Sequence, residues 1–101
     1  MKGKKMERLI KDLNKFSMGL VSEISQSKYL ELNDVYRIRL KGNDCKLRLG
    51  FINSMNDFSY DIEINYDAGW VFNVYDYEHG KDNRFNNYNE ILIFINEVDE
   101  I

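Results

Sequence analysis

The spacing of apolar residues changes once along this chain, from about 3.6 residues to 2, and this change restricts the folds it can form. From Met6 onward, apolar side chains recur every three or four residues with charged residues between them. Such a stripe is typical of an amphipathic helix with one buried face. We therefore predict a helix over residues 4–25, which contains Gly19 at a cost of about 1 kcal/mol relative to alanine.

Four later segments alternate between apolar and polar residues, which predicts half-buried strands. Their apolar members are Tyr36, Ile38 and Leu40; Cys45, Leu47, Leu49 and Phe51; Phe58, Tyr60, Ile62, Ile64 and Tyr66; and Trp70, Phe72 and Val74. A two-residue turn at Asn43 and Asp44 would pair Leu40 with Leu47, Ile38 with Leu49 and Tyr36 with Phe51, all on one face. The link from Asp67 to Gly69 fits a three-residue hairpin loop with glycine in the left-handed position.

The end of the chain is predicted to be a polar loop followed by a short helix. Residues 78–87 are rich in Asn, Asp and Gly and show no apolar repeat. From Tyr88 to Val98 an apolar stripe returns, although the run from Ile91 to Ile95 also fits a strand. Asn86 or Asn87 is a suitable N-cap, and this favours the helix.

Together these elements predict an α+β fold in one domain over residues 1–101. It has an N-terminal helix, a four-stranded antiparallel β-meander and a C-terminal helix. Both helices are expected to pack on one face of the sheet, because an antiparallel sheet needs cover on only one side. The other face is then open to water or to a partner.

Charge is divided unevenly along the chain. Residues 1–55 contain twelve Lys and Arg against six Asp and Glu, whereas residues 56–101 contain two against eleven. Arg37, Arg39, Lys41, Lys46 and Arg48 are expected to point outward from the first two strands, and Asp61, Glu63 and Asp76 outward from the next two. Centring the loop between strands two and three on Met55 and Asn56 puts Arg48 opposite Glu63. Cross-strand ion pairs would then neutralise this border, at some tenths of a kcal/mol each.

Residue types exclude most catalytic and cofactor chemistry. The lone Cys45 permits no internal disulfide and is expected to be a core residue. Asp76, Glu78 and His79 lie close together, but a transition-metal site normally needs further histidines or cysteines. The chain also lacks a glycine-rich phosphate loop. We therefore expect a non-enzymatic protein with no cofactor and no bound metal.

Composition also bears on location and source. No apolar run approaches the roughly 18–20 residues that cross a bilayer, and the basic start has no signal-peptide pattern, so we expect a cytoplasmic protein without a membrane partner. The chain has a single Ala and no Pro but many Asn, Lys, Ile and Tyr residues. These are the products of AT-rich codons, which indicates a low-GC bacterium or one of its phages.

An acidic, tyrosine-bearing surface is the strongest functional signal. Its predicted contact residues are Asp61, Glu63, Tyr75, Asp76, Tyr77, Glu78 and Asp82. Acids speed docking to a basic partner, and tyrosines anchor interfaces. This profile is similar in type to small inhibitors of nucleases and other nucleic-acid-handling effectors, which include toxin-immunity proteins and phage anti-CRISPR proteins. The similarity implies a basic effector protein as partner.

Two other functions fit the same sequence. The first is a nucleic-acid-binding or regulatory module that uses the basic strand residues Arg37, Arg39, Lys46 and Arg48. Against it, the sequence pI is about 5.1, and the acidic half would repel phosphate. The second is an assembly subunit that forms a small homo-oligomer through its open sheet face or an edge strand, whereas the inhibitor hypothesis is compatible with a monomer.

Overall fold

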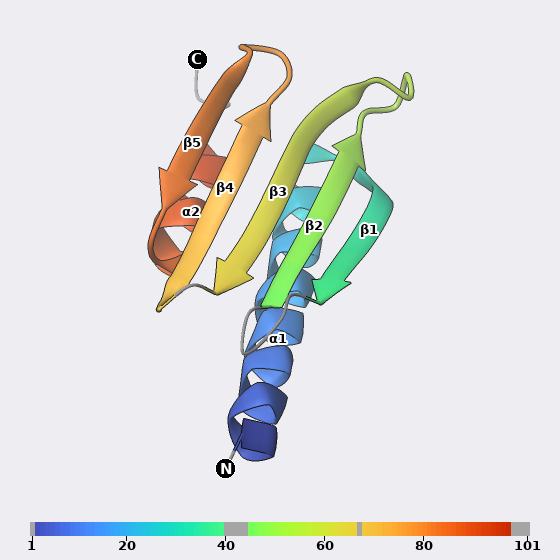
Figure 1. Cartoon of the computed structure of the whole chain (residues 1–101). Coiled ribbons are helices and arrows are strands. Elements are labelled where there is room, and N and C mark those ends of the chain that lie inside the picture. Colours follow the sequence, from blue (N-terminus) through green and yellow to red (C-terminus); the bar gives the residue numbers. More distant parts are fainter. Residues whose placement is uncertain (1, 40–44, 67, 98–101) are drawn as a thin grey trace.

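The structure is a computed structural model that describes residues 2–39, 45–66 and 68–97, with side chains described at 7–35, 46–66 and 68–97. The elements are α1 (Lys2–Lys28), β1 (Glu31–Arg39), β2 (Cys45–Ile52), β3 (Phe58–Tyr66), β4 (Trp70–Asp76), β5 (Lys81–Phe85) and α2 (Tyr88–Glu97). The strands form one antiparallel sheet in the order β1-β2-β3-β4-β5. Both helices lie behind the same face of this sheet, and α1 extends beyond its lower edge (Figure 1). The predicted α+β arrangement of helix, antiparallel meander and helix is confirmed.

The sheet has five strands rather than the four predicted, because β5 occupies part of the segment expected to be a loop. Its sequence, KDNRF, shows no apolar alternation. An edge strand that is largely exposed needs no apolar face, so period-2 reasoning cannot detect it. Phe85 packs against the core, where its ring lies 5.1 Å from that of Phe94 in α2.

The core lies between the sheet and the two helices, as the alternation in β2, β3 and β4 predicts. Its buried apolar residues are Leu9, Leu13, Leu20, Ile24, Leu30, Leu47, Leu49, Phe51, Tyr60, Ile62, Ile64, Phe72, Val74, Ile91 and Ile95. Within β2, β3 and β4, the residues that alternate with these buried positions are partly buried or exposed, except Gly50, which is buried. The face opposite the helices therefore remains uncovered.

The first strand differs from the prediction in both its start and its register. β1 begins at Glu31, directly after Tyr29 turns the chain with φ 56° and Leu30 enters the core. Phe51 pairs with Leu32 rather than Tyr36, and Leu49 pairs with Val35 rather than Ile38. A register shift between Leu32 and Asp34 accompanies this change. The predicted pairing depended on a turn at Asn43 and Asp44, which lie outside the described residues together with Leu40.

This register affects the predicted basic face. Arg37 pairs with Leu47 and Arg39 with Cys45, whereas Arg48 pairs with Tyr36. The backbone register of β1 against β2 therefore differs from the one predicted, and the side chains of Arg37 and Arg39 lie outside the described residues.

The β3–β4 hairpin and the last helix lie where the sequence predicts them. The left-handed conformation predicted for glycine is found at Ala68, with φ 55°, whereas the neighbouring Gly69 has a φ of 152°. Asn87 caps α2, because its side-chain Oδ1 accepts a hydrogen bond from the backbone N–H of Glu90 at 3.2 Å. The predicted inward residue Val98 lies outside the described residues.

Gly19 has a packing role that its sequence position did not reveal. A Cβ atom placed on Gly19 would collide with the hydroxyl oxygen of Tyr88 and would lie 3.2 Å from its Cζ. The Tyr88 ring stacks on Phe16 of α1 at 5.0 Å between centroids, so it has little freedom to withdraw. A glycine within the helix therefore lets the start of α2 approach α1 closely.

Helix α1 is long, but apolar and charged residues alternate along most of its length. Among the described residues, none of the helices combines the length and apolar character needed to cross a bilayer.

Replacing Gly19 tests this helix contact. Gly19→Ala improves helix propensity by about 1 kcal/mol, but the collision with the Tyr88 hydroxyl should reverse the gain and destabilise the fold by about 1 to 3 kcal/mol. In the Tyr88→Phe background the nearest atom becomes the ring carbon, so the same glycine substitution should be close to neutral. Urea unfolding of the two single variants and the double variant measures this coupling, with Ser25→Ala on the exposed side of α1 as the control. Equal effects of Gly19→Ala in both backgrounds would contradict the contact.

Candidate functional site

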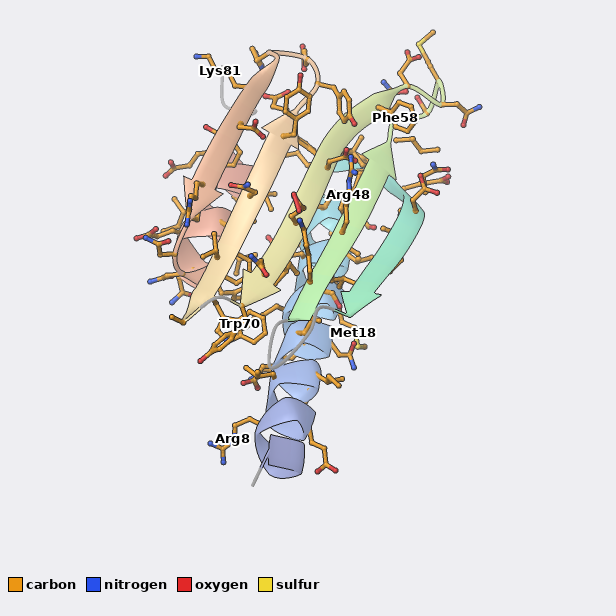
Figure 2. The ribbon with its side chains drawn as sticks, viewed as in Figure 1. Arg8, Met18, Arg48, Phe58, Trp70 and Lys81 are labelled. Carbon is orange, nitrogen blue, oxygen red and sulfur yellow. The ribbon has the colours of Figure 1, made fainter. Side chains whose placement is uncertain are left out.

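The open face of the sheet brings together most of the residues predicted to contact a partner. A shallow hollow of about 330 Å³ on this face is lined by Arg48, Asp61, Glu63, Asn73, Tyr75, Tyr77 and Asp82. Five of the seven predicted contact residues are therefore neighbours: Asp61, Glu63, Tyr75, Tyr77 and Asp82. Three strands and the turn after β4 contribute them, and Arg48 stands in the middle of the face in Figure 2.

Asp61 is the centre of the polar contacts in this hollow. Its carboxylate forms an ion pair with the Arg48 guanidinium and accepts a hydrogen bond from the Tyr77 hydroxyl at 2.6 Å. These two partners leave the Asp61 side chain only 13% exposed. Gly50 makes room for it, since a Cβ there would lie 3.3 Å from the Asp61 Oδ1 and 3.6 Å from the Cβ of Asp34. The absence of a side chain at Gly50 thus allows two carboxylate residues to lie over the backbone of β2.

The ion pairs are diagonal rather than directly across the strands. Arg48 stands opposite Glu63, as the loop geometry predicted. Nevertheless, Arg48 pairs with Asp61, and Glu63 pairs with Lys46 at 2.6 Å between Nζ and Oε1. The border between the basic and acidic halves of the sheet is therefore neutralised locally, which is the outcome that cross-strand pairing predicted.

The same contacts alter protonation. The hydrogen bond to Asp61 raises the pKa of Arg48, so its guanidinium remains charged. The hydrogen bond to Asp61, followed by partial burial, raises the pKa of Tyr77 above its ordinary value of 10.0. The Tyr77 hydroxyl therefore stays protonated throughout the neutral range and donates a hydrogen bond to Asp61.

Aromatic rings continue the site toward the upper end of the sheet. Tyr75 and Tyr77 pack edge to face with centroids 4.8 Å apart. Phe58, at the start of β3, lies 5.6 Å from Tyr77 on the other side. Alternation predicted Phe58 to be inward, yet it is 56% exposed. The register shift between Phe51 and Ile52, which pairs Ile52 with Phe58, ends the regular alternation at this position.

Asp76 was predicted to point outward with the other acids, and this is wrong. It follows Phe72 and Val74 in the inward alternation of β4 and is only 5% exposed. Its Oδ1 accepts hydrogen bonds from the backbone N–H groups of Glu78 at 3.0 Å and His79 at 3.2 Å. Its Oδ2 lies 2.6 Å from Nδ1 of His79. Asp76 thus holds the turn between β4 and β5 and is not a surface group for steering a partner.

The remaining predicted residue, Glu78, is exposed in that turn but does not line the open-face hollow. It lines a second hollow at the end of the sheet, together with Asp76 and Tyr77. Sequence reasoning assigned Arg48 to the basic alternative and passed over Phe58 and Asn73. The alternation of β4 already placed Asn73 on the same face as Tyr75, so this residue was open to prediction.

Other chemistry has little support in the described part of the chain. No three His, Cys, Asp or Glu side chains gather there as a metal site. The side chains of Cys45, Arg37 and Arg39 lie outside the described set. Lys46 and Arg48 from the basic alternative are both engaged in ion pairs with carboxylates.

No protein-family model matches this chain, and no curated protein or solved structure matches it.

Replacing Asp76 tests whether its carboxylate stabilises the turn or is only an acidic group at the surface. Asp76→Ala leaves backbone N–H groups without their acceptor and should destabilise the fold by about 1 to 3 kcal/mol. Asp82→Ala, on an exposed edge strand, should change stability by less than about 0.5 kcal/mol. Urea unfolding monitored by Trp70 fluorescence compares the two variants. Equal stabilities would show that the carboxylate of Asp76 is not needed for the turn.

The raised pKa of Tyr77 predicts a loss of stability in alkali. A group with a higher pKa in the folded state stabilises the fold below its unfolded pKa and loses that contribution as the pH rises through the folded value. As the pH rises above about 10, the urea midpoint of the wild-type protein should therefore fall more steeply than that of Tyr77→Phe. The other tyrosines are identical in the two proteins, so the difference isolates Tyr77. Parallel curves would contradict a hydrogen bond from Tyr77 to Asp61.

Proposed function

We propose that this protein is a small, non-enzymatic inhibitor that binds a basic nucleic-acid-handling effector, such as a nuclease or toxin, through its open sheet face. Toxin-immunity proteins and phage anti-CRISPR proteins are inhibitors of this type. The observation that carries the proposal is the grouping of Asp61, Glu63, Tyr75, Tyr77 and Asp82 around one hollow that no helix covers. Such an inhibitor would meet its effector in the cytoplasm.

Charge supports a basic partner. The hollow is lined by one arginine and three carboxylates, a formal balance of −2. The half of the chain from residue 56 onward, which forms β3, β4, β5 and α2, carries eleven acidic against two basic residues, and such an excess of negative charge favours association with a cationic partner. Proteins that handle nucleic acid carry basic surfaces for phosphate, and an acidic surface that docks there competes with the substrate.

The tyrosines support a protein interface rather than a small-molecule site. Tyr77 is 39% exposed and its position is fixed by Asp61, Tyr75 and Phe58. An aromatic side chain that is already ordered loses little conformational entropy when a partner covers it. Tyrosine is also enriched among the residues that dominate interface energies.

The nucleic-acid alternative has weaker support. Lys46 and Arg48 are neutralised by Glu63 and Asp61, and a phosphate would have to displace these carboxylates. A direct filter-binding measurement with single- and double-stranded DNA and RNA tests that alternative.

The function is tested by capture followed by an activity assay. The tagged protein is immobilised and used to capture proteins from lysates of low-GC bacteria at moderate salt. Support requires one stoichiometric basic partner whose nuclease or toxin activity disappears when the inhibitor is added at equal concentration. A partner that retains full activity, or recovery of nucleic acid alone, would overturn the proposal.

Two substitutions should then affect different kinetic steps. Asp82→Lys should mainly slow association with the effector, because it weakens electrostatic steering without removing a buried contact. Tyr77→Ala should mainly accelerate dissociation, by roughly tenfold or more if Tyr77 is an anchor. Surface plasmon resonance measures both rates, and Glu90→Lys on α2 is the charge control. If both variants behave as wild type while Lys46→Ala abolishes binding, the contact surface has been assigned wrongly.

A further inference from the structure

A second hollow opens at the end of the sheet, next to the first. It encloses about 400 Å³ and is bordered by the end of α1, the β2–β3 hairpin and the turn after β4. Its lining residues are Lys28, Leu30, Asn53, Phe58, Ser59, Tyr60, Asp76, Tyr77 and Glu78. In Figure 2, Phe58 marks this end of the molecule, well away from the protruding part of α1. The volume falls within the range of roughly 300–1,000 Å³ typical of binding pockets.

The walls of this hollow combine apolar and aromatic surface. Leu30 and Tyr60 belong to the buried core, so the hollow reaches the open end of the layer between helix and sheet. Phe58 and Tyr77 form the outer wall, with their ring planes tilted by 31°. A phenylalanine that is 56% exposed beside a partly exposed tyrosine is available for contact with a partner. These walls suit a ligand with an apolar stem and a flat, cationic end.

Charge at the hollow is slightly acidic. Asp76 and Glu78 face Lys28, which gives a formal balance of −1 for the lining. The Asp76 carboxylate is already hydrogen-bonded within the turn, whereas Glu78 is exposed beside Tyr77. An exposed carboxylate next to two aromatic rings offers a cation both an ion pair and a ring face.

From these features we infer that the hollow receives an arginine side chain of the basic protein partner. The methylene stem lies along Leu30 and Tyr60, and the planar guanidinium stacks on Phe58 or Tyr77 and pairs with Glu78. Lysine fits less well, because its ammonium group neither stacks nor forms a two-pronged pair with a carboxylate. This inference rests on the proposed function and names the chemistry that its partner must present.

Tyr77 connects this hollow to the open-face hollow, since it lines both. Its hydroxyl bonds to Asp61 on one side, and its ring meets Phe58 on the other. A partner segment that crosses Tyr77 therefore meets acidic groups on both sides of it. We expect the recognised segment to carry one basic residue for each hollow.

Two peptides of equal charge provide the test, namely hexa-arginine and hexa-lysine, titrated separately into the intact protein at low salt. Calorimetry gives the affinities, and amide NMR shifts locate the binding. Hexa-arginine should bind about fivefold more tightly than hexa-lysine and should shift the resonances of Phe58 and Glu78. Equal affinities, or shifts confined to other surfaces, would overturn the inference.

Substitutions at Phe58 and Glu78 identify the hollow. Phe58→Ala should remove most of the preference for arginine, and Glu78→Gln should weaken hexa-arginine binding about threefold. Ile93→Ala and Glu90→Gln are matched controls, since they remove an exposed apolar residue and an exposed acid from α2. If Phe58→Ala fails to fold, Phe58→Leu keeps an apolar side chain but removes the ring. An arginine preference that survives loss of the ring would refute stacking at this site.

The arginine site and the inhibitor function can be refuted separately. If the protein binds arginine selectively through Phe58 but inhibits no effector, the arginine site is supported and the inhibitor function is refuted. If Phe58→Ala does not change the inhibition of an effector and the two peptides bind with equal affinity, the inhibitor function is supported and the arginine site is refuted.

Discussion

One-sided burial of the sheet is the constraint on which the rest of the structure depends. Apolar residues at every second position of β2, β3 and β4 enter the core beneath the two helices. Their registers place these positions side by side, as Leu49, Ile62 and Val74 do across three strands. A shift of one residue would exchange the two faces, so the burial of the core also determines which polar side chains form the open face. The hollow around Asp61 is a consequence of that choice.

The carboxylates on this open face are paired with basic side chains in a definite arrangement. Arg48 and Lys46 each engage a carboxylate, which reduces the net field of the sheet itself. The ion pair with Arg48 fixes the position of the Asp61 carboxylate, and the hydrogen bond from Tyr77 to Asp61 in turn fixes Tyr77. Exposed ion pairs add little to stability, but a fixed tyrosine is a better anchor than a mobile one.

The sequence predicted the core and the grouping of most of the candidate residues, because both follow from strict alternation. The register of β2, β3 and β4 placed Asp61, Glu63, Tyr75 and Tyr77 together without any knowledge of the fold. Two predictions failed where alternation does not operate. β5 is an exposed edge strand with almost no apolar signal, and Phe58 lies at an irregular pairing. Asp76 was misassigned from its charge, although its position in β4 matched the inward residues.

The close approach of Gly19 to Tyr88 has a consequence for synthesis of the protein in the cell. Phe16 of α1 packs on Trp70, Phe72 and Tyr88, which lie far along the chain. Strands β1, β2 and β3 also contact α1, but this part of its apolar stripe is covered only after the residues of β4 and the start of α2 have been synthesised. Contacts of such high sequence separation form late, and they slow the completion of the core.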